Sequence, residues 1–197
     1  MRKMGILLAG AIALAACSSN RPPAPPVAID LNNPLMAPGF MAQAASGDQF
    51  EIQSSQLALQ MSQNPAIRNF ANMLIADHTR LSQAMAAAAV SAGLTPPPPA
   101  LLPAQQAALD QLRATAPGMA FDVAFQQAQI QAHQNALTLM QNYASGGDVP
   151  ALRAAASSAI PTIQMHLQQA QMLQVAVAPP PPPPMAAPPP RRAGERG

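Results

Sequence analysis

The sequence has few of the residues from which most catalytic sites are built. Its 197 residues include three histidines, one cysteine, one tyrosine and no tryptophan, and only 9% of them are charged. A single cysteine excludes an internal disulfide, so packing has to stabilise the fold. A G-x-S-x-G nucleophile elbow and a glycine-rich phosphate loop are also absent. These absences favour a protein without catalytic activity.

The chain also lacks the excess of positive charge that nucleic-acid binding requires. Its formal net charge is +2, but Arg2 and Lys3 precede an uncharged apolar run from Gly5 to Ala16. This run is too short to span a bilayer and is typical of a secretory signal. Without the signal, eight of the ten Lys and Arg residues remain, against eight Asp and Glu residues. The mature chain is therefore formally neutral, which excludes nucleic acid as a partner.

The end of the signal indicates lipidation. Leu14-Ala15-Ala16 precedes Cys17, an order that matches the bacterial lipobox, whose cysteine receives diacylglycerol. Residue 18 is serine, not the aspartate that commonly retains such lipoproteins in the inner membrane. We therefore expect acylated Cys17 to anchor the protein in membrane lipid, on the periplasmic side of the outer membrane. A plain signal peptide is the alternative.

Proline is concentrated in three segments. Of 24 prolines, six fall within residues 22–38, five within 96–103 and nine within 179–190. Because proline fixes φ and removes a backbone donor, we expect these segments to be extended and solvated. The predicted organisation is a signal peptide (1–16), a proline-rich tether (17–36), a helical domain (37–175) and a proline-rich disordered tail (176–197).

Between tether and tail, the composition is typical of helices. Alanine, glutamine, leucine and methionine dominate, and Pro65, Pro117 and Pro150 each follow a break and suit the start of a helix. Asp148 is a candidate N-cap for the last helix. Long helices are predicted at 37–62, 66–92, 117–144 and 149–175, with a short helix at 104–114. Their apolar stripes predict an all-α fold: a four-helix bundle with the short helix in the long connection between the second and third long helices.

Each predicted long helix has, on its inner face, one residue of a type that commonly binds metals: Glu51, His78, His133 and His166. They include every histidine and the only glutamate of the domain. Counting from the turns puts the first three at one level. Counted from the Gly146-Gly147 pair, His166 lies about two turns, or ~10 Å, from the level of His133.

Two aspartates accompany this set. Asp77 precedes His78 and lies at the edge of the inner face of the same helix. There it can pair with Arg80 or orient an imidazole of another helix beside a metal. Asp122 shares the face of His133 but comes eleven residues earlier, roughly 16 Å along the axis. It therefore cannot share an ion with His133.

The pattern leaves two kinds of buried site open. The sequence contains no Glu-x-x-His pair, so a di-iron centre is not expected. A mononuclear zinc, copper or iron site formed by Glu51, His78 and His133 is one interpretation. A metal-free cluster of hydrogen-bonded side chains is the other. In either case, His166 and Asp122 are candidates for a second polar layer.

Several motifs resemble a known family. They are "FANMLIADHT" at residues 70–79, "FD" at 121–122 with the later His133, and Pro161 with His166 and Ala170. Together these motifs are similar to the bacterial family called domain of unknown function 4142, described as predicted outer-membrane proteins with a ferritin-like helical bundle. The resemblance implies that fold and an envelope location, and no established activity. It puts both aspartates, Glu51 and the histidines at motif positions, whereas Phe125 stands where the family usually has tyrosine.

Two functions follow. The first is an outer-membrane-anchored lipoprotein with a structural or interaction role, whose partner is an envelope protein or the cell wall. The second is a metal-binding ferritin-like protein that uses Glu51, His78 and His133, with His166 as a further candidate ligand.

We predict that Cys17 is the lipidation site. The wild-type protein should incorporate labelled palmitate and fractionate with membranes, because its thiol carries the diacylglycerol. The Cys17→Ala variant should be unlabelled and soluble. A variant that stayed acylated and membrane-bound would contradict the prediction.

Overall fold

The computed structural model describes residues 30–175, in which all regular secondary structure is α-helical. The helices are α1 (Ala37–Met61), α2 (Pro65–Ser91), α3 (Pro103–Ala114), α4 (Met119–Gly146) and α5 (Pro150–Met172). Their bounds lie within three residues of the predicted ranges, and the all-α class is confirmed. The predicted signal, Cys17, most of the tether and the tail lie outside the described residues. No helix within 30–175 is both long and apolar enough to cross a membrane.

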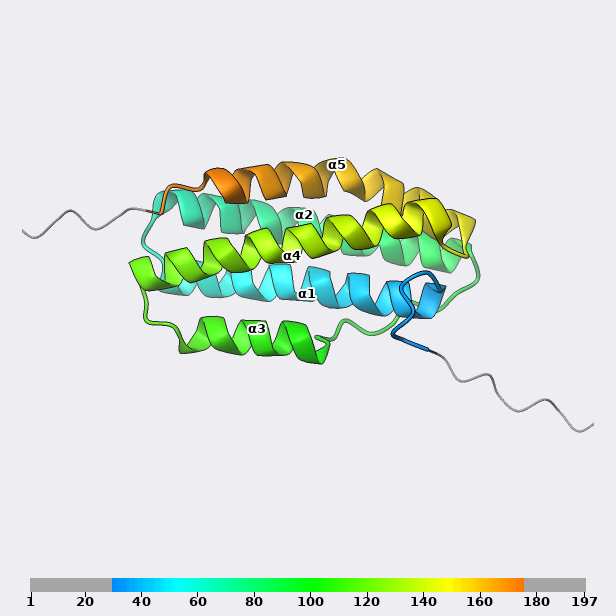
Figure 1. Ribbon diagram of the computed structural model, residues 1–197, viewed down its shortest axis with the longest axis horizontal. Coiled ribbons are helices and arrows are strands. Elements are labelled where there is room, and N and C mark those ends of the chain that lie inside the picture. The colour runs from blue at the N-terminus through cyan, green and yellow to red at the C-terminus, as the bar shows by residue number, and fades with distance from the viewer. Residues whose placement is uncertain (1–29, 176–197) are drawn as a thin grey trace, which may run out of the picture.

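The four long helices lie side by side, and α3 runs along the outside of α1 (Figure 1). Short connections join α1 to α2 and α4 to α5, so each of these pairs is an antiparallel hairpin. The two hairpins pack together through contacts of α1 with α4 and of α2 with α5. The connection that contains α3 returns along the length of the molecule before α4 begins (Figure 1). Each long helix therefore packs against two antiparallel neighbours.

Proline marks most of the helix starts, as predicted. It occupies the first or second position of α1, α2, α3 and α5. At α4, however, the helix begins after Gly118, whose φ of 87° favours glycine. The predicted capping role of Asp148 is wrong, because Val149 is the N-cap residue of α5. Asp148 instead accepts a 2.8 Å hydrogen bond from the buried Tyr143 hydroxyl, which needs a partner.

The apolar core is divided into two clusters. One surrounds Phe40 and Tyr143, whose rings stack with centroids 3.7 Å apart. The other surrounds Phe70, Phe121 and Phe125, with Phe125 stacked on Phe121 and edge-on to Phe70. Between them the helices carry the buried polar residues Glu51, His78, Gln129, His133 and His166. The middle of the domain is therefore a polar layer enclosed by apolar packing.

Part of the predicted tether folds against the domain. Residues 30–36 form turns, and the Leu35 carbonyl accepts a 3.2 Å hydrogen bond from the Asp148 amide. The Asn33 carbonyl lies so close to Gly39 that a Cβ atom at residue 39 would collide with it. The segment immediately before α1 is therefore packed, contrary to the expectation of an extended chain.

We predict opposite effects of alanine at two glycines of α1. Gly39→Ala should lower the free energy of unfolding by about 1–3 kcal/mol, because its Cβ would displace the backbone at Asn33. Gly47→Ala, which has no neighbour within 4 Å of the new Cβ, should raise it by about 0.5–1 kcal/mol. Urea unfolding followed by circular dichroism measures both changes. Equal changes in the two variants would show that the turn does not pack on Gly39.

Candidate metal centre

Three histidines from three different helices meet in the polar layer. His78 of α2, His133 of α4 and His166 of α5 are buried, and each offers a ligand atom within 4.8 Å of those of the other two. Their ring centroids are 5.3–5.5 Å apart. The sequence predicted His78 and His133 in one layer, but it placed His166 too far away.

The error for His166 came from the reference point of the count. His133 lies thirteen residues before the end of α4 at Gly146, and His166 lies sixteen residues after the start of α5 at Pro150. The difference of three residues corresponds to ~4.5 Å along the axis, which an imidazole side chain spans. The interhelical residues 147–149 do not add to the offset, because the chain reverses there. Moreover, α5 continues through Pro161 to His166 without interruption.

Each imidazole donates a hydrogen bond through one ring nitrogen. His78 Nδ1 lies 2.9 Å from Asp48 Oδ1, His133 Nδ1 lies 2.8 Å from the Gln129 carbonyl oxygen, and His166 Nε2 lies 2.9 Å from Asp77 Oδ2. A carboxylate or carbonyl oxygen is only an acceptor, so in each pair the ring nitrogen carries the proton. The three acceptors therefore fix the tautomer of all three histidines.

Within residues 30–175, the other ring nitrogens have no hydrogen-bond partner. They are His78 Nε2, His133 Nε2 and His166 Nδ1, and all three are buried. In a neutral imidazole whose proton is on the first nitrogen, the second nitrogen presents a lone pair. Leaving such a group buried and unpaired costs about 1–3 kcal/mol. Three lone pairs thus gather in one buried layer, an arrangement that a proton or a metal cation stabilises.

The electrostatic environment keeps two of the three rings neutral. Burial lowers the pKa of His133 to about 3, and the positive charge of His78 contributes to the same shift. Burial also lowers the pKa of His166, against the hydrogen bond with Asp77. For His78, burial is outweighed by the hydrogen bond with Asp48 and the charges of Glu51 and Asp48, so that its pKa is raised. The surroundings therefore favour a proton on His78 over one on His133 or His166.

Glu51 lies beside the three histidines but does not join them. Its Oε1 is 3.7 Å from His133 Nδ1, the nitrogen that already bonds the Gln129 carbonyl. Glu51 is not in the set of converging ligand atoms, so its predicted place in the layer is taken by His166. Burial raises the pKa of Glu51 to about 8, and its Oε2 has no hydrogen-bond partner among residues 30–175.

The two predicted aspartates have different surroundings. Asp77 accepts hydrogen bonds from both His166 and Arg80, so both of its predicted contacts occur in the structure. These bonds outweigh partial burial and lower the pKa of Asp77. Asp122 is buried in the first turn of α4. A second polar layer of Asp122 with His166 is therefore wrong, because His166 lies with the other histidines.

The sequence prediction missed Asp48, which anchors His78. Asp48 lies thirteen residues before the end of α1, and His78 lies thirteen residues after the start of α2. The two residues are therefore level in the α1–α2 hairpin, whereas Glu51 is one turn away along α1. Asp48 Oδ2 also accepts a 2.7 Å hydrogen bond from Ser82 Oγ. Counting from helix ends would have identified Asp48; the backbone carbonyl of Gln129 leaves no such signal.

We predict that Asp77 contributes to stability through His166. Asp77→Ala should cost about 1–3 kcal/mol, because it leaves the buried His166 Nε2 without an acceptor. Asp110→Ala is the matched control, since Asp110 also pairs with an arginine three residues later but is exposed and contacts no histidine. It should leave the unfolding midpoint unchanged. Chemical denaturation of both variants measures this difference, and equal midpoints would exclude a stabilising role of the Asp77–His166 bond.

Comparisons with known proteins place the fold in context. A solved structure described as CopM in the Cu(II)-bound form is similar, with a TM-score of 0.57 and 19% sequence identity. The match covers 69% of this chain and 93% of that chain, and at such an identity it concerns the fold alone. No curated protein matches the sequence. The family described as Domain of unknown function (DUF4142) matches residues 23–173, and the chain therefore belongs to the DUF4142 family.

Proposed function

We propose that this protein binds one copper(II) ion through His78, His133 and His166. The observation that carries the proposal is the convergence of three buried imidazoles, each with one nitrogen held by an acceptor and the other unpartnered. Histidines that bind metals are held in this way, with the second ring N–H donated to a carboxylate or carbonyl oxygen. Asp48, the Gln129 carbonyl and Asp77 supply those acceptors.

The donor set supports copper over the other metals. Three neutral imidazoles suit copper and zinc, and among divalent ions of the first transition series copper binds most tightly at such sites. The chain of similar fold is itself described as Cu(II)-bound. Bonds of ~2.0 Å between a metal and nitrogen place the ligand atoms roughly 3.3 Å apart, closer than the 4.8 Å limit within which they now lie. We therefore expect the imidazoles to move inward when the ion binds.

We propose that the four long helices form a ferritin-like four-helix bundle that acylated Cys17 holds at the periplasmic face of the outer membrane. The protein would then be an envelope metal-binding lipoprotein with no catalytic role. A structural or interaction role, with the histidines as a metal-free polar cluster, is the competing function.

We predict one copper ion per chain. Isothermal titration of the purified protein with Cu(II), followed by metal analysis after dialysis, should give a stoichiometry near one, and the electron paramagnetic resonance spectrum should show nitrogen ligands. His133→Ala should lose this binding, and Asp48→Ala should weaken it about 10–100-fold through loss of the His78 orientation. Asp110→Ala should bind as the wild type does.

Zinc and iron(II) titrations test the choice of metal. Zinc should bind more weakly than copper, in keeping with the stability order of divalent ions. A wild-type protein that holds no metal after dialysis, or a His133→Ala variant that retains its copper, would overturn the proposal and favour the structural or interaction role.

A further inference from the structure

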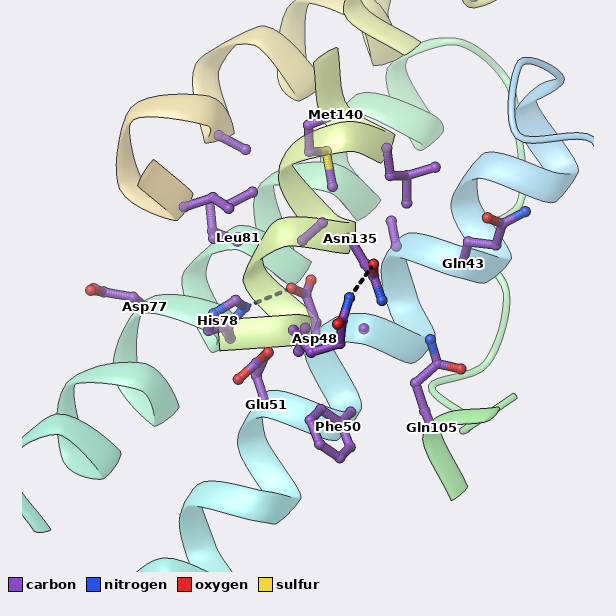
Figure 2. Close-up of a pocket in the computed structure, with 18 of the residues that line it drawn as sticks. Gln43, Asp48, Phe50, Glu51, Asp77, His78, Leu81, Gln105, Asn135 and Met140 are labelled. Carbon is purple, nitrogen blue, oxygen red and sulfur yellow. Dashed lines mark hydrogen bonds and ion pairs between the residues drawn. The ribbon is translucent and has the colours of Figure 1, made fainter. Parts of the chain in front are cut away.

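A cavity of about 960 Å³ reaches the three-histidine cluster from the surface of the domain. Residues of all five helices line it, and among them are His78 and Glu51 from the polar layer. Figure 2 shows Asp77 and Leu81 at one side of this cavity and Gln43 and Gln105 at the other. Its volume lies within the range of small-molecule sites in proteins. His133 and His166 are not in the lining, so the cavity meets the cluster at His78, and Glu51 lines it as well.

Within the part of the chain that the structure describes, three ligand groups converge in this layer. The chain has three histidines, and all belong to the cluster. The carboxylates Asp48 and Asp77 bond ring nitrogens of His78 and His166, and Glu51 is not in the converging set. A structural metal site is usually closed by four protein ligands, whereas a site with three protein ligands keeps a position for an external molecule. The cavity and this layer share His78.

The wall of the cavity favours a neutral occupant. Most of it is apolar and rich in alanine, with side-chain amides such as Gln43, Gln105 and Asn135. Its one arginine, Arg80, pairs with Asp77, and Asp48 accepts a bond from His78, so the lining offers no unpaired cation to hold an anion. Apolar walls with a few amides suit a small organic molecule that is uncharged and has its own hydrogen-bonding groups.

Glu51 supplies a polar contact where the cavity meets His78. Its side chain is buried, it lines the cavity, and its Oε2 has no partner within the described residues. A buried carboxyl oxygen without a partner is suited to accept a hydrogen bond from an occupant of this space. In Figure 2 the Glu51 side chain lies next to His78.

We propose that the cavity admits a small neutral molecule with a nitrogen donor, which binds the copper ion at its fourth position and donates an N–H hydrogen bond to Glu51. This inference rests on the proposed copper centre and adds to it a class of ligand and a path of entry. The protein then holds copper together with an organic ligand.

Imidazole is a suitable probe because it is neutral, has one donor nitrogen and one N–H, and is small enough for the cavity. The Cu(II)-loaded protein is titrated with imidazole, 1-methylimidazole and azide, with electron paramagnetic resonance and visible absorption as readouts. Metal analysis after each titration checks that copper stays bound. Imidazole should change the spectra saturably, and azide should bind more weakly than imidazole.

Variants of the cavity wall test the path of entry. Ala136→Phe fills the cavity from α4 and should weaken imidazole binding about tenfold, whereas Ala120→Phe, on α4 but outside the lining, should not. Ala128→Leu, a smaller insertion in the same wall, replaces Ala136→Phe if that variant fails to fold. Copper stoichiometry should be one in each folded variant.

Glu51→Ala tests the hydrogen bond. In the wild type, imidazole should bind about fivefold more tightly than 1-methylimidazole, which has no N–H to donate, and in Glu51→Ala this preference should vanish. Copper bound at one per chain with spectra that imidazole leaves unchanged would overturn the inference while the proposed function stands. Tighter binding of azide, equal effects of Ala136→Phe and Ala120→Phe, or a preference that survives Glu51→Ala would also overturn it. Absence of copper binding would overturn the proposed function and this inference with it.

Discussion

The arrangement of the domain depends on the need to pair three imidazoles inside an apolar core. A buried polar group without a partner destabilises the fold by about as much free energy as a good hydrogen bond contributes. Each histidine therefore requires an acceptor at a fixed place. Asp48 on α1, the Gln129 carbonyl on α4 and Asp77 on α2 meet this need for His78, His133 and His166, respectively. Two of these bonds join different helices. They therefore fix the register of α1 against α2 and of α2 against α5.

The apolar clusters on either side of the polar layer make this register selective. A shift of α5 by one turn would move His166 into the surroundings of Ile163 or Ala170, which belong to different apolar clusters. It would also withdraw Asp77 from its partner. The cost of an unpaired buried imidazole and the cost of repacking thus act in the same direction. The division of the core into two halves is accordingly a consequence of placing polar side chains at mid-height in all four long helices.

The chemistry of the layer differs from that of carboxylate-rich metal sites in helical bundles. Such di-iron sites combine glutamates with Glu-x-x-His pairs. Here the ligand-type groups that converge are three neutral nitrogens, and the carboxylates Asp48 and Asp77 lie behind them as acceptors. Glu51 stands at the wall of the cavity with a free oxygen. Three nitrogen donors, each oriented by an oxygen acceptor, favour a borderline metal such as copper or zinc over a hard cation.

Much of this structure follows from the sequence alone. Helical composition and proline positions placed the helices within three residues, and the apolar periodicity put all three histidines inside, because both signals are local and act along one helix. Which residues of different helices meet depends on their positions along the bundle axis, and one helical turn separates Glu51 from Asp48. The sequence therefore identified His78 and His133 as neighbours but assigned Glu51 the place of His166. Only the tertiary structure decided that place, because contacts between helices follow from where each helix ends and how the chain reverses.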